Sequence, residues 1–214
     1  MILKSYVKRT GRYTQAQKKA YESLSEKFLI PFSENHLNIK NLTVEIGFGS
    51  GFATAEIAQG NPDKNYLGIE VHKPGIGRLL WEIENRKLGN ISIIEYDAVP
   101  VFEKMIKKAS LDAIHIFFPD PWPKKRHQKR RLVQQPFTQI LSASLKPGGY
   151  IYMVTDWEDY ALFALEELTK TAGIKNKYEG FSPGQSWRPK TRFEQKGLDK
   201  DHIIRELFFV KSPC

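Results

Sequence analysis

Five acidic residues are candidates for binding a ligand or for catalysis, because each lies at or close to the end of an apolar stretch. They are Glu45, Glu70, Asp97, Asp120 and Asp156. Asp120 lies between Pro119 and Pro121, and prolines exclude both a helix and a central strand at that point. Trp122 follows closely. A carboxylate beside an aromatic ring can accept hydrogen bonds from a flat heterocycle that stacks on the ring.

A run of cations follows Asp120 directly. Residues 124–131 hold six lysines and arginines and no acid, and residues 1–20 hold another six with no acid. Because the net charge of the whole chain is +9, the remainder is acidic on balance. Cations gathered in two patches favour a polyanionic partner such as a nucleic acid. The alternative is a solvated surface with no partner.

The elements that would position these residues alternate along the chain. The hydrophobic pattern predicts strands at 42–48, 65–71, 91–98, 111–118 and 150–156, and helices at 14–30, 50–60, 74–89, 99–110, 132–145 and 157–173. This alternation is typical of an α/β fold with a largely parallel sheet covered on both faces. Ligands bind at the carboxyl ends of such strands, so the five acids should surround one site. The strand-like residues 202–210 need not continue the alternation.

The first strand-to-helix turn, "EIGFGSG", contains Gly47, Gly49 and Gly51. Glycines there allow positive φ and a close approach of a ligand to the backbone. Glu70 ends the second strand, at the position from which a carboxylate binds ribose hydroxyls. A nucleoside-containing cofactor is therefore favoured over a purely structural turn. The spacing differs from the G-x-G-x-x-G of dinucleotide sites, and Glu45 suits a cationic ligand such as S-adenosylmethionine better than a pyrophosphate.

Length and composition predict one domain, residues 1–214, on which a basic segment and helix at residues 1–30 pack. No apolar stretch reaches the roughly 20 residues of a membrane span, and no signal-peptide pattern is present, so we expect a cytoplasmic protein that contacts no membrane. The single cysteine is Cys214. This excludes a disulfide within the chain, a cysteine metal cluster and the cysteine nucleophile of C5-pyrimidine methyltransferases. We expect no metal.

Four motifs in order resemble the bacterial tRNA (guanine-N7)-methyltransferase family. They are "EIGFGSG", "PDPWPKKRHQKRR", "TDW" at 155–157 and "TRFEQKG" at 191–197, and the start "KSYVKRTGRYTQAQ" is similar to bacterial members. One difference is visible after the last motif. The family usually has Gly-His there, whereas His202 follows Asp201 in this chain. This difference bears on the backbone geometry of that loop.

The resemblance implies the Rossmann-like class I methyltransferase fold, with a seven-stranded, mostly parallel sheet and helices on both faces. It implies S-adenosylmethionine as cofactor and tRNA as partner, with methyl transfer to N7 of a variable-loop guanosine (position 46). By similarity, Asp120 is catalytic, and the cofactor-binding residues are Glu45, Gly47, Gly49, Gly51, Glu70, Asp97, Ala98 and Asp120. The substrate-binding residues would be Lys124, Asp156, Thr191, Arg192, Phe193 and Glu194. The RNA-binding residues would be Arg126, His127, Gln128, Lys129, Arg130 and Arg131.

Guanine N7 has a free lone pair at neutral pH, so direct displacement needs no base, and we expect alignment and electrostatics to carry catalysis. One alternative is an exocyclic-amine RNA methyltransferase, whose acid-Pro-Pro-aromatic loop "DPWP" nearly matches. Another is a non-catalytic RNA-binding Rossmann-like module, which would not require five acids at strand ends. A nicotinamide-dependent oxidoreductase is disfavoured by the glycine spacing. We expect a monomer, with a homodimer as the alternative.

Overall fold

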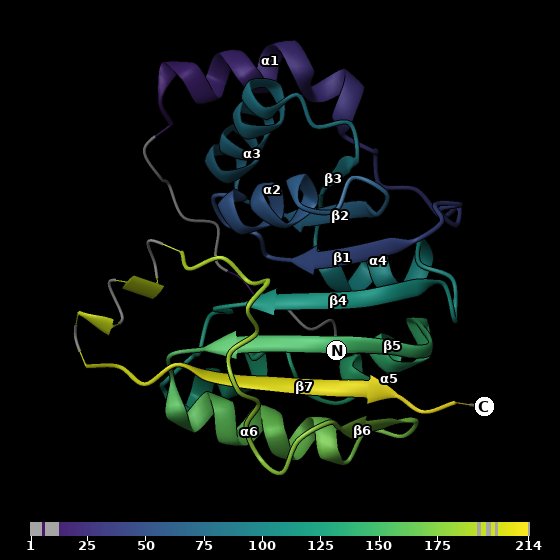
Figure 1. Cartoon of the computed structure of the whole chain (residues 1–214), viewed down its shortest axis with the longest axis vertical. Helices are drawn as coiled ribbons and strands as arrows, with labels where there is room; N and C mark the ends of the chain where they lie inside the picture. The colour runs from purple at the N-terminus through teal and green to yellow at the C-terminus, as the bar shows by residue number, and fades with distance from the viewer. Residues whose placement is uncertain (1–5, 7–12, 192–193, 196–197, 200, 214) are drawn as a thin grey trace.

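The computed structural model describes residues 6, 13–191, 194–195, 198–199 and 201–213. Within them, seven strands form one sheet in the order β3-β2-β1-β4-β5-β7-β6 (Figure 1). The strands are β1 Leu42–Ile46, β2 Asn65–Glu70, β3 Ile91–Glu95, β4 Leu111–Phe117, β5 Leu145–Thr155, β6 Ile174–Asn176 and β7 Arg205–Lys211. Strands β1 to β5 pair in parallel, and β7 is antiparallel to both of its neighbours. The predicted seven-stranded, mostly parallel α/β sheet is confirmed.

Helices cover both faces of this sheet. They are α1 Gln15–Phe28, α2 Phe52–Gln59, α3 Lys73–Arg86, α4 Ala98–Lys104, α5 Phe137–Ser144 and α6 Glu158–Thr169, together with the 3₁₀ helix η1 Lys125–Arg130. Buried side chains of α4, α5 and α6 form one hydrophobic cluster, and those of α1, α2 and α3 form the other. Successive side chains of β5 point to opposite faces of the sheet and therefore belong to different clusters. Met153 lies in the first cluster, and Tyr152 and Val154 lie in the second.

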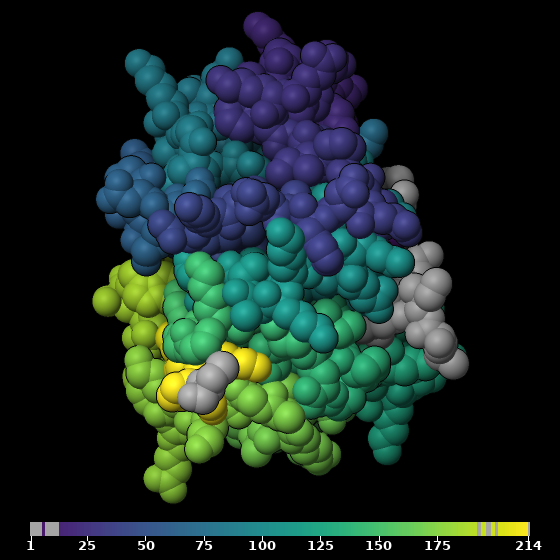
Figure 2. All heavy atoms as spheres, turned by 90° about the vertical axis from the view of Figure 1, so that its right-hand side faces the viewer, coloured from purple at the N-terminus to yellow at the C-terminus, as the bar shows by residue number. Residues whose placement is uncertain are grey.

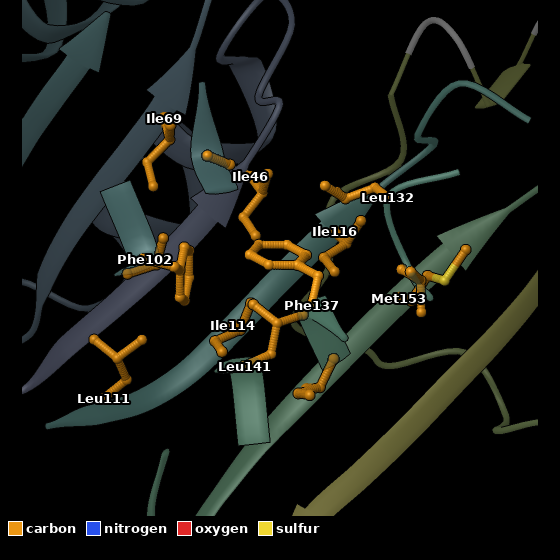
Figure 3. Close-up of a cluster of buried hydrophobic side chains, with 14 of the residues drawn as sticks. Ile46, Ile69, Phe102, Leu111, Ile114, Ile116, Leu132, Phe137, Leu141 and Met153 are labelled. Carbon is orange, nitrogen blue, oxygen red and sulfur yellow. The ribbon is translucent and has the colours of Figure 1, made fainter. Parts of the chain in front are cut away.

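Figure 3 shows the first cluster, in which Ile114 and Ile116 of β4 lie against Phe102 of α4 and Phe137 of α5. The Phe102 and Phe137 rings meet edge to face, with 5.6 Å between their centroids. Fully burying each such side chain stabilises the fold by about 1.5–3 kcal/mol. The packing of this cluster holds β1, β2 and β4 in place and so fixes the positions of their carboxyl ends.

Helix α1 packs against α3 at one end of the molecule, where it is coloured purple (Figure 1, Figure 2). A capping box begins the helix, because Thr14 and Gln17 each accept a hydrogen bond from the other's backbone amide. Gly77 of α3 permits the close approach, since a Cβ there would lie 2.5 Å from the Gln17 carbonyl oxygen. Most of the basic segment before α1 lies outside the described residues.

Several helices are shorter than the hydrophobic pattern predicts, and α4 and α5 show the physical reasons. Helix α4 ends at Lys104, and Ala109 takes a positive φ of 50° within the stretch that was expected to be helical. Helix α5 begins only at Phe137, directly after Pro136. Because proline has no amide hydrogen, the helix cannot extend back through it with intact hydrogen bonds. The freed residues 132–136 instead connect η1 to α5. Among the described residues, no helix has the length and apolarity to cross a bilayer.

Candidate active site

A cavity of about 330 Å³ opens at the carboxyl ends of β1, β2, β3 and β4. The topology places it at the point where strand order reverses, since β1 lies between β2 and β4. Of the residues expected to bind a cofactor, six line this cavity: Gly47, Gly49, Glu70, Asp97, Ala98 and Asp120. Tyr6, from the N-terminal segment, also lines it. Tyr6 was not among the predicted site residues, because the stretch that contains it was notable for its charge and for its resemblance to bacterial family members, and neither feature indicates a contact with a ligand.

The glycine turn is held open by its backbone conformation and by Glu70. Gly47 and Gly49 have φ values of +71° and +57°, which favour glycine. The Glu70 carboxylate accepts hydrogen bonds from the Gly49 amide (2.9 Å) and from the Val71 amide (2.7 Å). A Cβ at Gly47 or Gly49 would meet no described atom within 4 Å. Space for a ligand therefore remains beside the turn.

Glu45 and Gly51 lie behind the turn and do not line the cavity. The Glu45 side chain is only 4% exposed, and Thr54 of α2 donates a hydrogen bond of 2.7 Å to its carboxylate. Burial raises the pKa of Glu45 to about 7; the Thr54 hydrogen bond opposes this shift and nearby Glu70 adds to it. A Cβ at Gly51 would collide with Leu79 of α3 at 2.5 Å. These two residues shape the turn from within.

Asp97 and Asp120 come from the next two strand ends. Asp97 caps α4, because its carboxylate accepts a hydrogen bond of 3.1 Å from the Val99 amide. Asp120 lies between Phe118 and Trp122, which take positive φ values of 50° and 48°. The Trp122 ring contacts η1, with the Arg130 guanidinium 5.1 Å and the His127 ring 5.9 Å from its centroid. The acidic loop and the basic segment are thus packed together.

The basic segment is largely exposed. Lys124, Lys125, Arg126 and Lys129 are exposed, and His127, Gln128 and Arg130 are half-buried. Partial desolvation and the neighbouring cations lower the pKa of His127, so its imidazole adds little positive charge at neutral pH. Arg131 differs from these residues. It was expected to lie along RNA, but its side chain is 1% exposed and is held by Asp159 of α6.

The residues expected to bind the substrate base are only partly brought together. Asp156 lies 3.1 Å from His202, between carboxylate Oδ2 and imidazole Nδ1. Thr191 accepts a hydrogen bond of 3.1 Å from the Glu194 amide. Arg192 and Phe193 lie outside the described residues. Asp201, the residue that differs from the family pattern, has a φ of +59°, so the loop keeps a conformation that glycine adopts without strain.

Glu194 is turned inward, whereas it was expected to face a guanine. Arg188 donates to both of its carboxylate oxygens at 2.6 and 2.8 Å, and also to Glu206 at 2.8 Å. Although burial opposes the effect, the Arg188 guanidinium holds the pKa of Glu194 below its usual value. Tyr152 donates a hydrogen bond to Glu206. The one feature of the sequence that could have indicated this network is Glu206 within an apolar stretch, because an acid that is buried there needs a cation as partner.

The arrangement can bind a nucleoside-containing ligand beside the glycine turn and place an acid next to it. The described part of the chain contains no group of three or more His, Cys, Asp or Glu side chains placed to hold a metal ion. Residues 40–207 match a family model whose description reads "Putative methyltransferase".

Relatives and solved structures extend this match. The chain is 47% identical to the tRNA (guanine-N(7)-)-methyltransferase of Nitrosomonas eutropha, over 98% of this chain and 97% of that protein. It is 43% identical to the protein of the same name from Francisella tularensis subsp. novicida, over 98% and 95%. The 16S rRNA methyltransferase KamB has a TM-score of 0.60 at 12% identity, over 96% and 97%. TrmN from Thermus thermophilus has 0.56 at 14%, over 92% and 48%. The solved structures show a shared fold.

Proposed function

Because this chain belongs to the tRNA (guanine-N7)-methyltransferase family, we propose that it transfers the methyl group of S-adenosylmethionine to N7 of a variable-loop guanosine in tRNA. The observation that carries the proposal is the place of Asp120. Its loop lines the cavity beside the glycine turn and leads directly into the cationic segment η1. A methyl donor on one side and an RNA strand on the other would meet at this carboxylate.

The residues around the cavity fit S-adenosylmethionine. The open space beside Gly47 and Gly49 suits the amino-acid part of the cofactor, and Glu70 stands where ribose hydroxyls are bound. Asp97 and Ala98 lie at the neighbouring strand end, where an adenine would lie. When bound, the cofactor supplies a methyl group activated on a sulfonium. The carboxylates of this rim favour such a cation and disfavour a pyrophosphate.

The chain's own contribution to catalysis is positioning and charge. In this transfer the N7 lone pair would form the new bond to the methyl carbon while the carbon–sulfur bond breaks, and the electron pair of that bond would stay on sulfur. The guanine gains the positive charge that the sulfonium loses. In-line alignment of the two reacting atoms can supply about 7–11 kcal/mol. The Asp120 carboxylate would accept hydrogen bonds from the guanine edge or the cofactor and stabilise the charge that develops on the base.

The test is methyl transfer from labelled S-adenosylmethionine to unmodified tRNA, with the product nucleoside identified by mass spectrometry. We expect 7-methylguanosine, and no transfer when the target guanosine is replaced by 7-deazaguanosine. A product methylated on the exocyclic amine would assign the chain to the other class of RNA methyltransferase. Binding of tRNA without any transfer would indicate a non-catalytic module.

Changing Gly75 to alanine should weaken cofactor binding at least tenfold. Gly75 lies in the first turn of α3, and a Cβ there would sit 2.0 Å from the Gly49 carbonyl oxygen. The glycine turn would have to move, and it would then no longer fit its ligand. Isothermal titration with S-adenosylmethionine measures the effect. Gly89→Ala is the matched control, because a Cβ there meets nothing within 4 Å. Equal affinity for wild type and Gly75→Ala would contradict this packing argument.

Neutralising the exposed and half-buried cations of η1 should weaken tRNA binding more than it slows chemistry. With Arg126, Lys129 and Arg130 changed to glutamine, we expect KM for tRNA to rise about 10- to 100-fold at physiological salt, because fewer counterions are released on binding. The slope of log affinity against log salt should become shallower. The control changes Lys64, Lys107 and Lys108 to glutamine. These exposed cations precede β2 and β4, at the amino ends of the strands and so away from the cavity. Unchanged tRNA affinity at low salt would show that η1 is not the docking surface.

A further inference from the structure

Arg131 differs from every other cation of the basic segment in its surroundings. Its neighbour Lys129 is exposed, whereas the Arg131 side chain is 1% exposed and among the largest fully buried side chains of the described residues. A phosphate of RNA cannot reach a guanidinium that is already enclosed by protein. The basic character of Arg131 therefore needs another explanation than RNA binding.

The contacts of Arg131 connect two elements of the site. Its guanidinium carbon lies 5.1 Å from the ring centre of Tyr160 and 4.9 Å from that of Phe163, both on α6. Its terminal nitrogen donates to the carboxylate of Asp159 in the first turn of α6. Its Nε donates a hydrogen bond of 3.0 Å to the carbonyl oxygen of Pro121. The side chain thus bridges α6 and the loop that carries Asp120.

That loop needs an external support. Residues 119, 121 and 123 are prolines without amide hydrogens, so these three residues cannot donate a backbone hydrogen bond. Phe118 and Trp122 flank it in the left-handed region, which is strained for residues other than glycine. Conformations of this kind persist only where surrounding groups hold them. The Pro121 carbonyl is the atom by which Arg131 holds the residue next to Asp120.

We infer that Arg131 is a positioning residue for Asp120 and not a ligand of RNA. By holding the Pro121 carbonyl against α6, it fixes the carboxylate at the mouth of the cavity. The inference rests on the proposed function, because it assigns Asp120 to the reacting centre. It also divides the basic segment into two parts: exposed cations that set tRNA affinity, and one buried cation that sets the geometry of catalysis.

Arg131→Lys is the first test, because it keeps the positive charge and loses the planar guanidinium that bonds Pro121 and Asp159 together. We expect the single-turnover rate at saturating tRNA and cofactor to fall about tenfold or more, with the Kd for tRNA and its salt dependence unchanged. Lys129→Gln is the contrast, and should raise the Kd and make the salt slope shallower by about one. A raised Kd with an unchanged rate in Arg131→Lys would overturn the inference.

Asp159→Asn is the second test, because it releases the other end of the same bridge and removes no cation. We expect a smaller fall in rate, about three- to tenfold, with tRNA binding unchanged. Asp159 is 62% exposed, so this variant should fold even where Arg131→Lys does not, and it then decides the question alone. A wild-type rate in Asp159→Asn would overturn the inference. Formation of 7-methylguanosine by the wild-type protein is measured alongside, and its absence would refute the proposed function instead.

Discussion

Replacing Asp120 with asparagine or alanine is expected to lower kcat by about 100-fold or more. Asparagine keeps the size of the side chain and removes its charge, so the comparison of Asp120→Asn with wild type isolates the electrostatic part of the effect. Asp120 lines the cavity and belongs to the loop that leads to η1, so its carboxylate can act on the base that becomes cationic. The binding of S-adenosylmethionine should change much less, because the glycine turn, Glu70 and Asp97 remain.

The measurement is the single-turnover rate with both substrates saturating, together with the Kd of each substrate. Asp63→Asn serves as the matched control, since Asp63 is an exposed acid in the turn before β2, at the amino ends of the strands and so away from the cavity. Activity within a few-fold of wild type in both Asp120 variants would remove the carboxylate from the reaction. Catalysis would then depend on alignment alone.

The topology of the site could be predicted from the sequence because it depends on local patterns. Apolar runs that alternate with helical periodicity predict parallel strands whose carboxyl ends lie on the same side of the sheet. The cavity found there is lined by Gly47, Gly49, Glu70, Asp97 and Asp120. Each of these residues is within three positions of a strand end, so its location follows from the strand itself. Boundaries such as the start of α5 could not be read as well, because buried residues outside a helix give the same apolar pattern as those within it.

The inward-facing charges could not be predicted, because they depend on partners far away in the chain. Arg131 is one of six cations in a run, and a run of cations predicts a solvated face. Only the position of Tyr160 and Phe163 on α6 shows that this member is enclosed. Glu194 is similar, since its ion pair with Arg188 forms within a loop that has no periodic pattern. In both cases the sequence indicated a charged residue and the fold decided its role.

The free protein should lose stability as the pH rises from 4.5 to about 7, because of Glu45. Burial raises its pKa to about 7, from 4.5 in an ordinary carboxyl group. The folded protein therefore keeps a proton that the unfolded chain releases in this range. Stability from this group is complete below pH 4.5 and falls until about pH 7, by about 3 kcal/mol. Denaturant unfolding of the free protein at pH 5 and pH 8 measures the change.

Glu45→Gln tests the cause, because glutamine cannot ionise and can still accept the hydrogen bond from Thr54. At pH 8 the free variant should be about 2–3 kcal/mol more stable than wild type, and at pH 4.5 the two should be alike. Glu84→Gln, at an exposed position of α3, should leave the pH profile unchanged. Parallel profiles for wild type and Glu45→Gln would show that Glu45 is ionised in the free protein.

The same variant should bind S-adenosylmethionine more weakly at pH 8, because a cationic ligand favours the ionised carboxylate behind the glycine turn. A buried acid that destabilises the free protein and strengthens cofactor binding would then account for both results.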